Sequence, residues 1–501
     1  MLGLGTVYGD WASLTLSSFV FLALLTLASR YFLGSLKHIP GPFVAKFSSL
    51  PLFYQAWHGN RVFWIMEQHR RYGPVIRIAP DKVCVASSDG IKKIYGTKTA
   101  KSEAYSTFRY HDVKMCIGLL DVKSAHQRRK GLLPAFSRQN LVEMEPVIRG
   151  HLQSFLHWLQ VFDRRNVPVD AFKWFRYLTF DVVADISFGQ KIGMLDGDDS
   201  HFIQQVEYRN KRNSLNGPFP FILPVLRLLR SDTAKHWMEA DEEIAKYAIR
   251  AKEGWSKSEN QDRPRVDILA RLEEARTLNP ENGLSDKEII AEMMEILNAG
   301  SDTTANTAMF ACFELACRPE VQKALQQELH DAFPDPTEPL LLEKLERLPY
   351  LDGVCREGLR LHAPIPSYLE RVAPPGGLEI SGCFIPAGTK VGMQSYTNHR
   401  NPTVYPQPEE FIPDRWNGPT PEMKLNFLPF SAGPRACIGL NLANMQLRIH
   451  LGHIFRKYSV HCAEDTTRAS MRHVEFFAIR PKSGTCNLYF RQIEQQEQKC
   501  V

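Results

Sequence analysis

One short segment of this 501-residue chain, from Phe430 to Gly439, constrains its fold and chemistry more than any other feature. It reads Phe-Ser-Ala-Gly-Pro-Arg-Ala-Cys-Ile-Gly, so Cys437 follows a Gly/Pro turn with Arg435 two positions before it. Gly433 and Gly439 allow the backbone to turn tightly and to approach a flat ligand closely. A thiolate in such a turn is suited to bind iron, and an adjacent guanidinium is suited to bind a propionate. The segment therefore predicts a haem-thiolate site with Cys437 as the axial iron ligand.

The same segment resembles the haem-binding signature of the cytochromes P-450, the haem-thiolate monooxygenases. The positions that carry the resemblance are Phe430, Gly433, Arg435, Cys437 and Gly439. The resemblance implies haem b (iron protoporphyrin IX) as cofactor. It also implies a single haem domain that is mainly α-helical with a small β region, and it covers residues 45–490.

Composition excludes several other classes of function. The net charge of +6, without a dense Lys/Arg stripe interleaved with aromatics, argues against a nucleic-acid partner. The ten cysteines include no CxxC pair and no zinc spacing, which argues against a disulfide scaffold or a zinc ribbon. No Gly-x-Gly-x-x-Gly is present, so the electrons must come from a separate protein.

The N-terminal region predicts a membrane anchor. Trp11 to Ser29 contains no charged residue, and as a helix it spans roughly 28 Å, about one hydrocarbon core. Arg30 and Lys37 follow, so the positive-inside rule places the rest of the chain in the cytosol. A cleaved signal peptide is disfavoured, because the apolar run is long and no small-x-small cleavage site ends it. The apolar segment Pro218 to Pro224 is too rich in proline for a helix, and is either a loop that dips into the bilayer or a buried connector.

These features divide the chain into five parts. We expect a lumenal N-terminus over residues 1–10, a transmembrane anchor over 11–33, a proline-rich hinge over 34–44, the catalytic domain over 45–490 and a polar tail over 491–501. Apolar spacing from Glu288 to Cys317 predicts a long helix in the domain, and Ser285 fits a capping box at its start. Residues 75–78 and 82–85 predict a hairpin, and residues 382–391 predict another β turn.

A carboxylate and a hydroxyl lie side by side in the motif Ala299-Gly300-Ser301-Asp302-Thr303-Thr304 of the long helix. The small residues Ala299 and Gly300 would let this helix pass close to a planar ligand. Asp302 and Thr303 are suited to relay protons during oxygen activation. The motif resembles the oxygen-activating motif of the family with every position filled, which favours monooxygenation.

Glu357, Arg360 and Arg415 are expected to form a structural network. Glu357 and Arg360 are three residues apart and share one face of a helix. On a surface such a pair would contribute less than about 1 kcal/mol. The family resemblance implies instead that the pair is buried, is joined by Arg415, and fixes the loop that presents Cys437. The aspartate and tryptophan that flank Arg415 depart from the commoner Glu and Phe.

Haem propionates need cationic partners. Arg435 is the first candidate, and Arg371 resembles a second. In the basic segment 126–130 the resemblance indicates a third, either Arg129 or Lys130, because the chain is one residue shorter than many relatives before the next proline. Without the resemblance, this segment reads as a solvated basic patch.

The substrate wall is expected to be mostly apolar, which favours a lipophilic substrate. A loop from Tyr105 to Leu120 should cover the haem. The other expected wall residues are Leu297, Ala299, Gly300, Ile365, Tyr368, Phe476 and Phe477. As apolar side chains, they equally fit an ordinary core.

We interpret the sequence as a membrane-anchored monooxygenase that inserts one oxygen atom of O2 into a lipophilic small molecule. The resemblance implies an NADPH-dependent flavoprotein reductase as electron donor, and the endoplasmic reticulum bilayer as location. Residues 386–389 and 399–416 are similar in style to filamentous-fungal members, many of which act in secondary metabolism. The alternatives are a catabolic or detoxifying hydroxylase of small aromatics, and a haem-thiolate isomerase or dehydratase that uses no O2. A non-catalytic haem sensor would have no use for a complete proton relay.

Overall fold

A computed structural model describes Ser18 and residues 34–96, 99–197, 201–257, 267–278, 283–335 and 337–493. The expected lumenal segment (1–10) and membrane anchor (11–33) lie outside the described residues except for Ser18, as does the polar tail beyond residue 493. Within the described ranges, no helix is both long and apolar enough to cross a bilayer.

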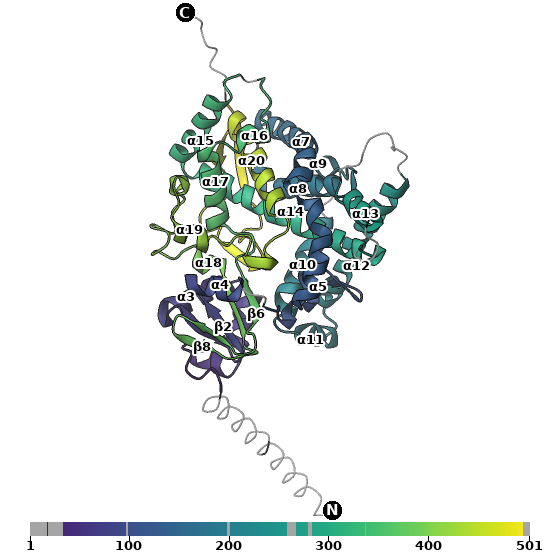
Figure 1. The fold of residues 1–501 in the computed structure, drawn as a ribbon. Coiled ribbons are helices and arrows are strands. Elements are labelled where there is room, and N and C mark those ends of the chain that lie inside the picture. Colours follow the sequence, from purple (N-terminus) through teal and green to yellow (C-terminus); the bar gives the residue numbers. More distant parts are fainter. Residues whose placement is uncertain are drawn as a thin grey trace, which may run out of the picture.

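The described chain is mostly helical with a smaller β region, as the sequence predicts (Figure 1). The main helices are α2 (Leu50–Trp57), α3 (Arg61–Tyr72), α4 (Ser88–Ile94), α5 (Val122–Leu132), α6 (Arg138–Glu143), α7 (Glu145–Arg164), α8 (Ala171–Phe188), α10 (His201–Asn216), α11 (Ile222–Leu228), α12 (Asp232–Lys257), α13 (Ile268–Leu278), α14 (Asp286–Ala316), α15 (Pro319–Ala332), α17 (Pro349–Leu361), α19 (Pro421–Asn426) and α20 (Leu440–Lys457). Short helices include η1 (Phe43–Lys46), η2 (Glu103–Thr107), η3 (Cys116–Gly118), η5 (Pro413–Trp416) and η6 (Gly433–Arg435).

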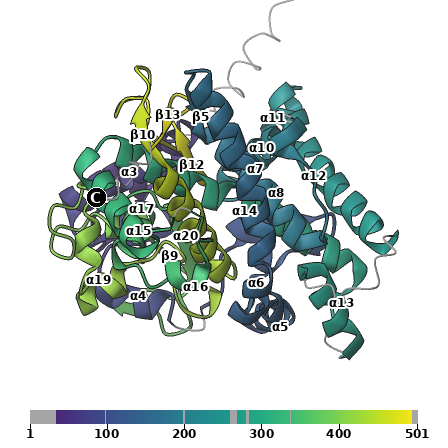
Figure 2. The same ribbon diagram turned by 90° about the horizontal axis from the view of Figure 1, so that it is seen from above.

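Helix α14 runs through the middle of the molecule and packs against α8, α17 and α20 (Figures 1 and 2). It begins as predicted, because the Ser285 side chain and Glu288 complete a capping box. Buried residues occur on all faces of α14, so neighbouring helices pack around it. This position carries the Asp302–Thr303 motif into the interior.

The largest sheet has the strand order β1 (Val75–Ala79), β2 (Lys82–Val85), β9 (Lys390–Gln394) and β6 (Tyr368–Val372). The β1–β2 pair is antiparallel, which confirms the predicted hairpin, and β7 (Leu378–Ile380) with β8 (Cys383–Ile385) forms a further hairpin near the second predicted turn. A second sheet joins β10 (Tyr458–Cys462), β13 (Asn487–Gln492) and β5 (Val169–Asp170). Strands β11 (His473–Phe476) and β12 (Ala478–Pro481) form a separate pair.

The segment expected as a hinge packs on the largest sheet. Leu36 and Ile39 are buried in one apolar cluster with Val83 of β2. The backbone N–H of Arg77 donates to the carbonyl of Pro40 at 2.7 Å. These contacts tie residues 36–40 to the folded body.

The expectation that Pro218 to Pro224 cannot be helical is wrong from Ile222 onward. Helix α11 begins at Ile222, and Pro224 is its third residue. A proline is tolerated there, because the first N–H groups of a helix have no intrahelical acceptor. Phe219 is buried against Phe53 of α2, with ring centroids 5.3 Å apart.

Candidate active site

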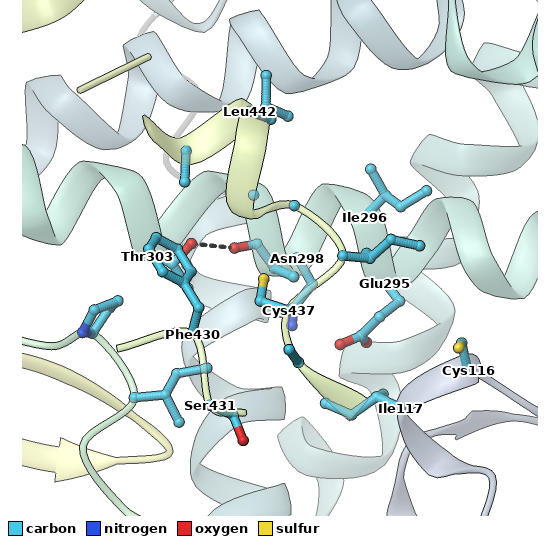
Figure 3. A pocket seen from close by; sticks show the side chains of 18 of the residues that line it. Cys116, Ile117, Glu295, Ile296, Asn298, Thr303, Phe430, Ser431, Cys437 and Leu442 are labelled. Carbon is cyan, nitrogen blue, oxygen red and sulfur yellow. Dashed lines mark hydrogen bonds between the residues drawn. The ribbon is translucent and has the colours of Figure 1, made fainter. Parts of the chain in front are cut away.

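A cavity lies between α14, the segment before α20, and the loop around Ile117 (Figure 3). The sequence-predicted residues that line it are Arg129, Asp302, Thr303, Arg371, Phe430, Arg435, Cys437 and Gly439. Lys130, Gly433, Glu357, Arg360 and Arg415 do not line it. Figure 3 shows the Cys437 sulfur among the lining residues, with Thr303, Asn298 and Glu295 of α14 around it.

Cys437 is held in a tight loop. Its backbone N–H donates to the carbonyl of Phe430 at 2.9 Å, and the N–H of Ser431 donates to the carbonyl of Leu428 at 3.1 Å. Gly433 adopts φ +70°, and a Cβ there would lie 1.8 Å from the carbonyl oxygen of Tyr95. The sequence reasoning assigned this glycine to close approach of a flat ligand. The structure shows close approach to the backbone of Tyr95 instead.

Gly439 differs from one part of its prediction, the tight turn. Its φ of −82° is open to any residue, so it makes no glycine-only turn. A Cβ at this position would contact the Cys437 sulfur at 3.9 Å. The absence of a side chain therefore leaves space beside the sulfur.

Cys437 is exposed because its side chain opens onto the cavity, and protein atoms surround the sulfur on its other sides. Burial raises the pKa of its thiol, while the backbone N–H of Gly439 and the charge of Arg129 act in the opposite direction. Cys437 also lies just before the N-terminus of α20, where the helix dipole favours a negative charge. These groups favour the thiolate once a positive ion is bound to the sulfur.

Asp302 and Thr303 are both at the cavity, but each has a partner within the protein. The Asp302 carboxylate is buried and accepts hydrogen bonds from Arg176 Nε at 2.7 Å and Asn210 Nδ2 at 3.2 Å. Arg176 also binds Glu207 at 2.7 Å, and Glu207 is half-buried. The Thr303 hydroxyl donates to the carbonyl of Ala299 at 2.7 Å. Its oxygen lone pairs remain available to accept a hydrogen bond.

Gly300 allows close helix packing and also borders the cavity, where the sequence predicts the approach of a ligand. A Cβ there would lie 2.7 Å from a methyl group of Val183 in α8. Both helices bury this contact, so the small residue lets α14 pass close to α8. Gly300 still borders the cavity with its backbone.

Four cations face the cavity without an anionic partner. Arg129, Arg371 and Arg435 line it together with Lys101, which sequence reasoning missed. Among the ion pairs of the described residues, none joins any of these four to a carboxylate. Arg435 donates to the carbonyl of Leu119 through Nη2, while its buried Nη1 has no hydrogen-bond partner.

Lys101 is the one amine among these four residues, and it is buried. Its Nζ donates to the carbonyl of Ile117 at 2.8 Å and lies 4.4 Å from the ring centroid of Tyr105. Burial and the positive charges of Arg371 and Arg435 hold its pKa well below the usual value. A lone lysine carries no sequence signal for this role, since Arg371 and Arg435 come from distant segments of the chain.

This arrangement fits the haem that the sequence predicts. A buried group of cations with an orphan guanidinium N–H requires an anion, and two propionates would supply two negative charges. Of the two basic candidates, Arg129 lines the cavity and Lys130 is exposed. Arg129, Arg371, Arg435 and Lys101 are therefore the side chains placed to hold the propionates.

Glu357 and Arg360 form a closed network away from the cavity. Both are fully buried, and two hydrogen bonds of 2.8 Å join the guanidinium to the carboxylate. Glu357 also accepts from Arg415 Nε and from the indole of Trp416, both at 2.9 Å. The tryptophan that seemed a departure from the family pattern is thus part of the network.

The network reaches the Cys437 loop through His399. The carbonyl of Arg360 binds His399 Nδ1 at 2.8 Å, and the backbone N–H of Leu428 donates to Nε2 at 2.8 Å. The backbone donor fixes the tautomer, because Nε2 must be the acceptor. Burial lowers the pKa of His399 to about 3, so the ring stays neutral.

The predicted substrate wall is partly wrong. Ala299, Ile365 and Phe477 line the cavity, as do Tyr105 and Ile117 from the predicted loop. Leu297, Tyr368 and Phe476 do not. Leu297 lies in the main apolar core, the Tyr368 hydroxyl donates to backbone carbonyls of the large sheet, and Phe476 packs against Lys211 and Arg480. Periodicity identifies the buried helix but does not fix which of its faces meets the cavity.

Comparisons with known proteins agree with this geometry. A family model described as cytochrome P-450 matches residues 40–488. Benzoate 4-monooxygenase bphA of Aspergillus niger is 33% identical over 476 residues, covering 87% of this chain and 91% of that protein. The cytochrome P-450 monooxygenase tazI of Aspergillus terreus is 29% identical, covering 95% and 98%. Trichothecene C-4 hydroxylase of Trichoderma arundinaceum is 28% identical, covering 87% and 88%.

Proposed function

Since the chain belongs to the cytochrome P-450 family and is therefore a haem-thiolate monooxygenase, we propose that it oxidises a lipophilic small molecule in fungal secondary metabolism. The enzyme inserts one oxygen atom of O2 into its substrate. The mostly apolar wall formed by Ala299, Ile365 and Phe477 supports a lipophilic substrate. The similarity to a trichothecene hydroxylase supports the metabolic assignment. An isomerase or dehydratase without O2 is not favoured.

We assign the iron to Cys437. The observation that carries this assignment is the sulfur opening onto the cavity, directly before the N-terminus of α20. Haem bound to a thiolate supplies oxygen activation and substrate oxidation. Arg435, Arg371 and Arg129, with Lys101, would hold its propionates.

Asp302 and Thr303 are assigned to proton delivery. Thr303 has acceptor lone pairs at the cavity, where they can hold a water or a substrate hydroxyl. Asp302 connects through Arg176 to Glu207, whose side chain is partly exposed. Arg176 stays protonated and does not pass the proton on. Instead, the Asp302 carboxylate can release Arg176, take up a proton from solvent and carry it to the cavity.

The electron donor is a reductase, as the family implies, and we propose an NADPH-dependent flavoprotein. We further propose a single-pass anchor over residues 11–33 in the endoplasmic reticulum membrane, a lumenal segment over 1–10, and a cytosolic catalytic domain over 45–490. Exposed apolar side chains support contact with a bilayer: Phe43, Leu50, Tyr54, Phe221, Leu228 and Leu229. They lie on η1, α2 and α11, and Phe53 joins α2 to Phe221 with ring centroids 5.8 Å apart.

The test is the absorbance spectrum of the reduced, carbon-monoxide-bound protein beside a Cys437→His variant. We expect a strongly red-shifted Soret band in the wild-type protein and its loss in the variant. An imidazole-type band in both proteins would refute the assignment of Cys437.

A substrate screen with reductase and NADPH then tests the metabolic proposal. We expect turnover of lipophilic polycyclic compounds and little turnover of benzoate. Turnover of benzoate alone would instead support a hydroxylase of small aromatics, the second candidate, which the similarity to a benzoate monooxygenase suggests.

A further inference from the structure

Two cysteines outside the cavity meet near the surface. Cys317 is the C-cap residue of α14 and is exposed, and Cys462 is the half-buried last residue of β10. Their Sγ atoms lie 3.8 Å apart, although 145 positions separate them along the chain. A disulfide bond has a sulfur–sulfur distance of about 2 Å, so the two sulfurs would have to move closer by about 2 Å to form one.

The two backbones are held together independently of the sulfurs. The side chain of Gln322 in α15 donates to the carbonyls of Leu315 and Val460, at 3.2 and 3.0 Å. Its oxygen accepts from the backbone N–H of Val460 at 2.7 Å. One buried amide thus joins the end of α14 to β10, and the dithiol does not depend on a mobile segment for its geometry.

The surroundings of Cys317 favour a thiolate. Arg468 and Arg318 both bind Glu314, one turn before Cys317 in α14. The hydrogen bond from the Cys462 thiol lowers the pKa of Cys317 to about 7. The two guanidinium charges also lower this pKa, while burial and the Glu314 charge raise it. The thiolate is the form of cysteine that attacks a disulfide.

The other cysteines named here differ from this pair in burial or in lacking a sulfur–sulfur contact. Cys84, Cys312 and Cys355 are buried, and burial raises the pKa of each thiol. Cys383 in β8 is half-buried like Cys462. In the described chain, the sulfur–sulfur contact is recorded for Cys317 and Cys462 alone. Cys383 therefore serves as an internal reference for general oxidation.

We propose that Cys317 and Cys462 form a redox-active dithiol that exchanges with small-molecule disulfides such as oxidised glutathione. The Cys317 thiolate attacks one sulfur of the small disulfide, forms a mixed disulfide, and releases one thiolate that takes up a proton. Cys462 then loses its proton and attacks Cys317 Sγ, which releases the second thiol. Two electrons and two protons pass from the cysteine pair to the small disulfide, and two small thiols are produced.

The cytosolic location proposed above suits a reversible modification of this cysteine pair. In a reducing compartment a disulfide persists only while the oxidant is present, so such pairs sense the redox state. The bond would join the end of the central helix to the sheet of β10. The chemistry does not depend on the haem or on the assigned substrate.

The experiment treats the full-length, haem-loaded protein with glutathione buffers of increasing oxidised fraction, followed by alkylation and peptide mass spectrometry. We expect Cys317 and Cys462 to lose alkylation together and to appear as one linked peptide pair. Cys383 should stay alkylated, and excess reduced glutathione should restore both thiols. If Cys317 and Cys462 stay alkylated under conditions that modify Cys383, the proposal is wrong.

Single variants separate the two roles. Cys462→Ser should accumulate a stable glutathione adduct on Cys317, because no second thiol displaces it. Cys317→Ser should leave Cys462 unmodified. The Soret band of each variant checks that it is folded and loaded. An unmodified Cys317 in Cys462→Ser, or equal modification of Cys462 in Cys317→Ser, would overturn the order of attack and the proposal with it.

Discussion

The protein contains two groups of buried arginine side chains that differ in whether their charge is compensated. At Glu357, all five N–H donors of Arg360 have acceptors: the carboxylate takes two, and the carbonyls of His399, Pro408 and Glu410 take three. At the cavity, no ion pair of the described residues joins Arg435 or its neighbours to a carboxylate, and Nη1 of Arg435, with its two N–H groups, has no acceptor. A network that is complete within the protein stabilises the fold. A network that is incomplete stabilises a ligand.

The two groups are connected, which explains why one supports the other. His399 links Arg360 to Leu428, and Leu428 binds the backbone of the loop that carries Arg435 and Cys437. The complete network thus positions the incomplete one. Substitutions in the Glu357 network should prevent folding and haem incorporation. Substitutions among the cations at the cavity should weaken haem binding and leave the fold intact.

Breaking the complete network should have the largest effect. Glu357→Ala leaves buried Arg360 and Arg415 without their carboxylate, and we expect a loss of about 3–5 kcal/mol in the free energy of unfolding. The protein should fail to incorporate haem, as measured by Soret absorbance per protein. Glu343→Ala is the matched control, because Glu343 pairs with Arg347, both side chains are exposed, and the substitution should cost less than about 1 kcal/mol. A haem-loaded Glu357→Ala protein would contradict the comparison.

The second prediction concerns Asp302, which is paired like Glu357 yet borders the cavity. Asp302→Asn keeps a hydrogen-bond acceptor for Arg176 but removes the ionisable group. We expect a normal carbon-monoxide spectrum and a fall of about a hundredfold in the rate of product formation. The rate of product formation at saturating substrate and reductase is the measurement. An unchanged rate would remove Asp302 from the proton path.

The third prediction concerns the incomplete group. Lys101→Met and Arg129→Met should each increase the rate of haem loss to a haem scavenger by about tenfold, because one charge-assisted hydrogen bond is lost. The melting behaviour should change little. Lys130→Met is the matched control, since Lys130 is exposed and does not line the cavity. Equal haem loss in all three variants would show that general surface charge, rather than the cavity, decides retention.

The smallest expected effect is a pH dependence at the edge of the cavity. Burial raises the pKa of Glu292 to about 7, against the charge of Arg128, while the unfolded chain has a value near 4.5. Between these two pH values Glu292 is protonated in the folded protein and ionised in the unfolded chain. The free energy of unfolding therefore falls as the pH rises from about 4.5 to about 7. Glu292→Gln should flatten this slope by no more than about 1 kcal/mol per pH unit, measured by urea unfolding. A steeper slope in the variant would contradict the sign.

Local sequence patterns determined a large part of this description. The capping box at Ser285, the β1–β2 hairpin, and the motif at Asp302 and Thr303 each lie within a few consecutive residues. Their geometry depends on the backbone of one element, so spacing alone predicts it. The Phe430–Gly439 segment likewise indicated both the family and the position of the cysteine.

Only the tertiary structure decided which side chains face the cavity and which join the buried network at Glu357. Lys101, Trp416 and the choice of Arg129 over Lys130 depend on contacts between segments far apart in the chain. The position of Gly300 against Val183 depends on such contacts too. The sequence indicated only that Gly300 would let the helix approach a ligand. Patterns of apolar and polar residues show that a position is buried, but its partner depends on how whole helices and loops pack against each other. That packing is a property of the whole chain, and no single segment contains it.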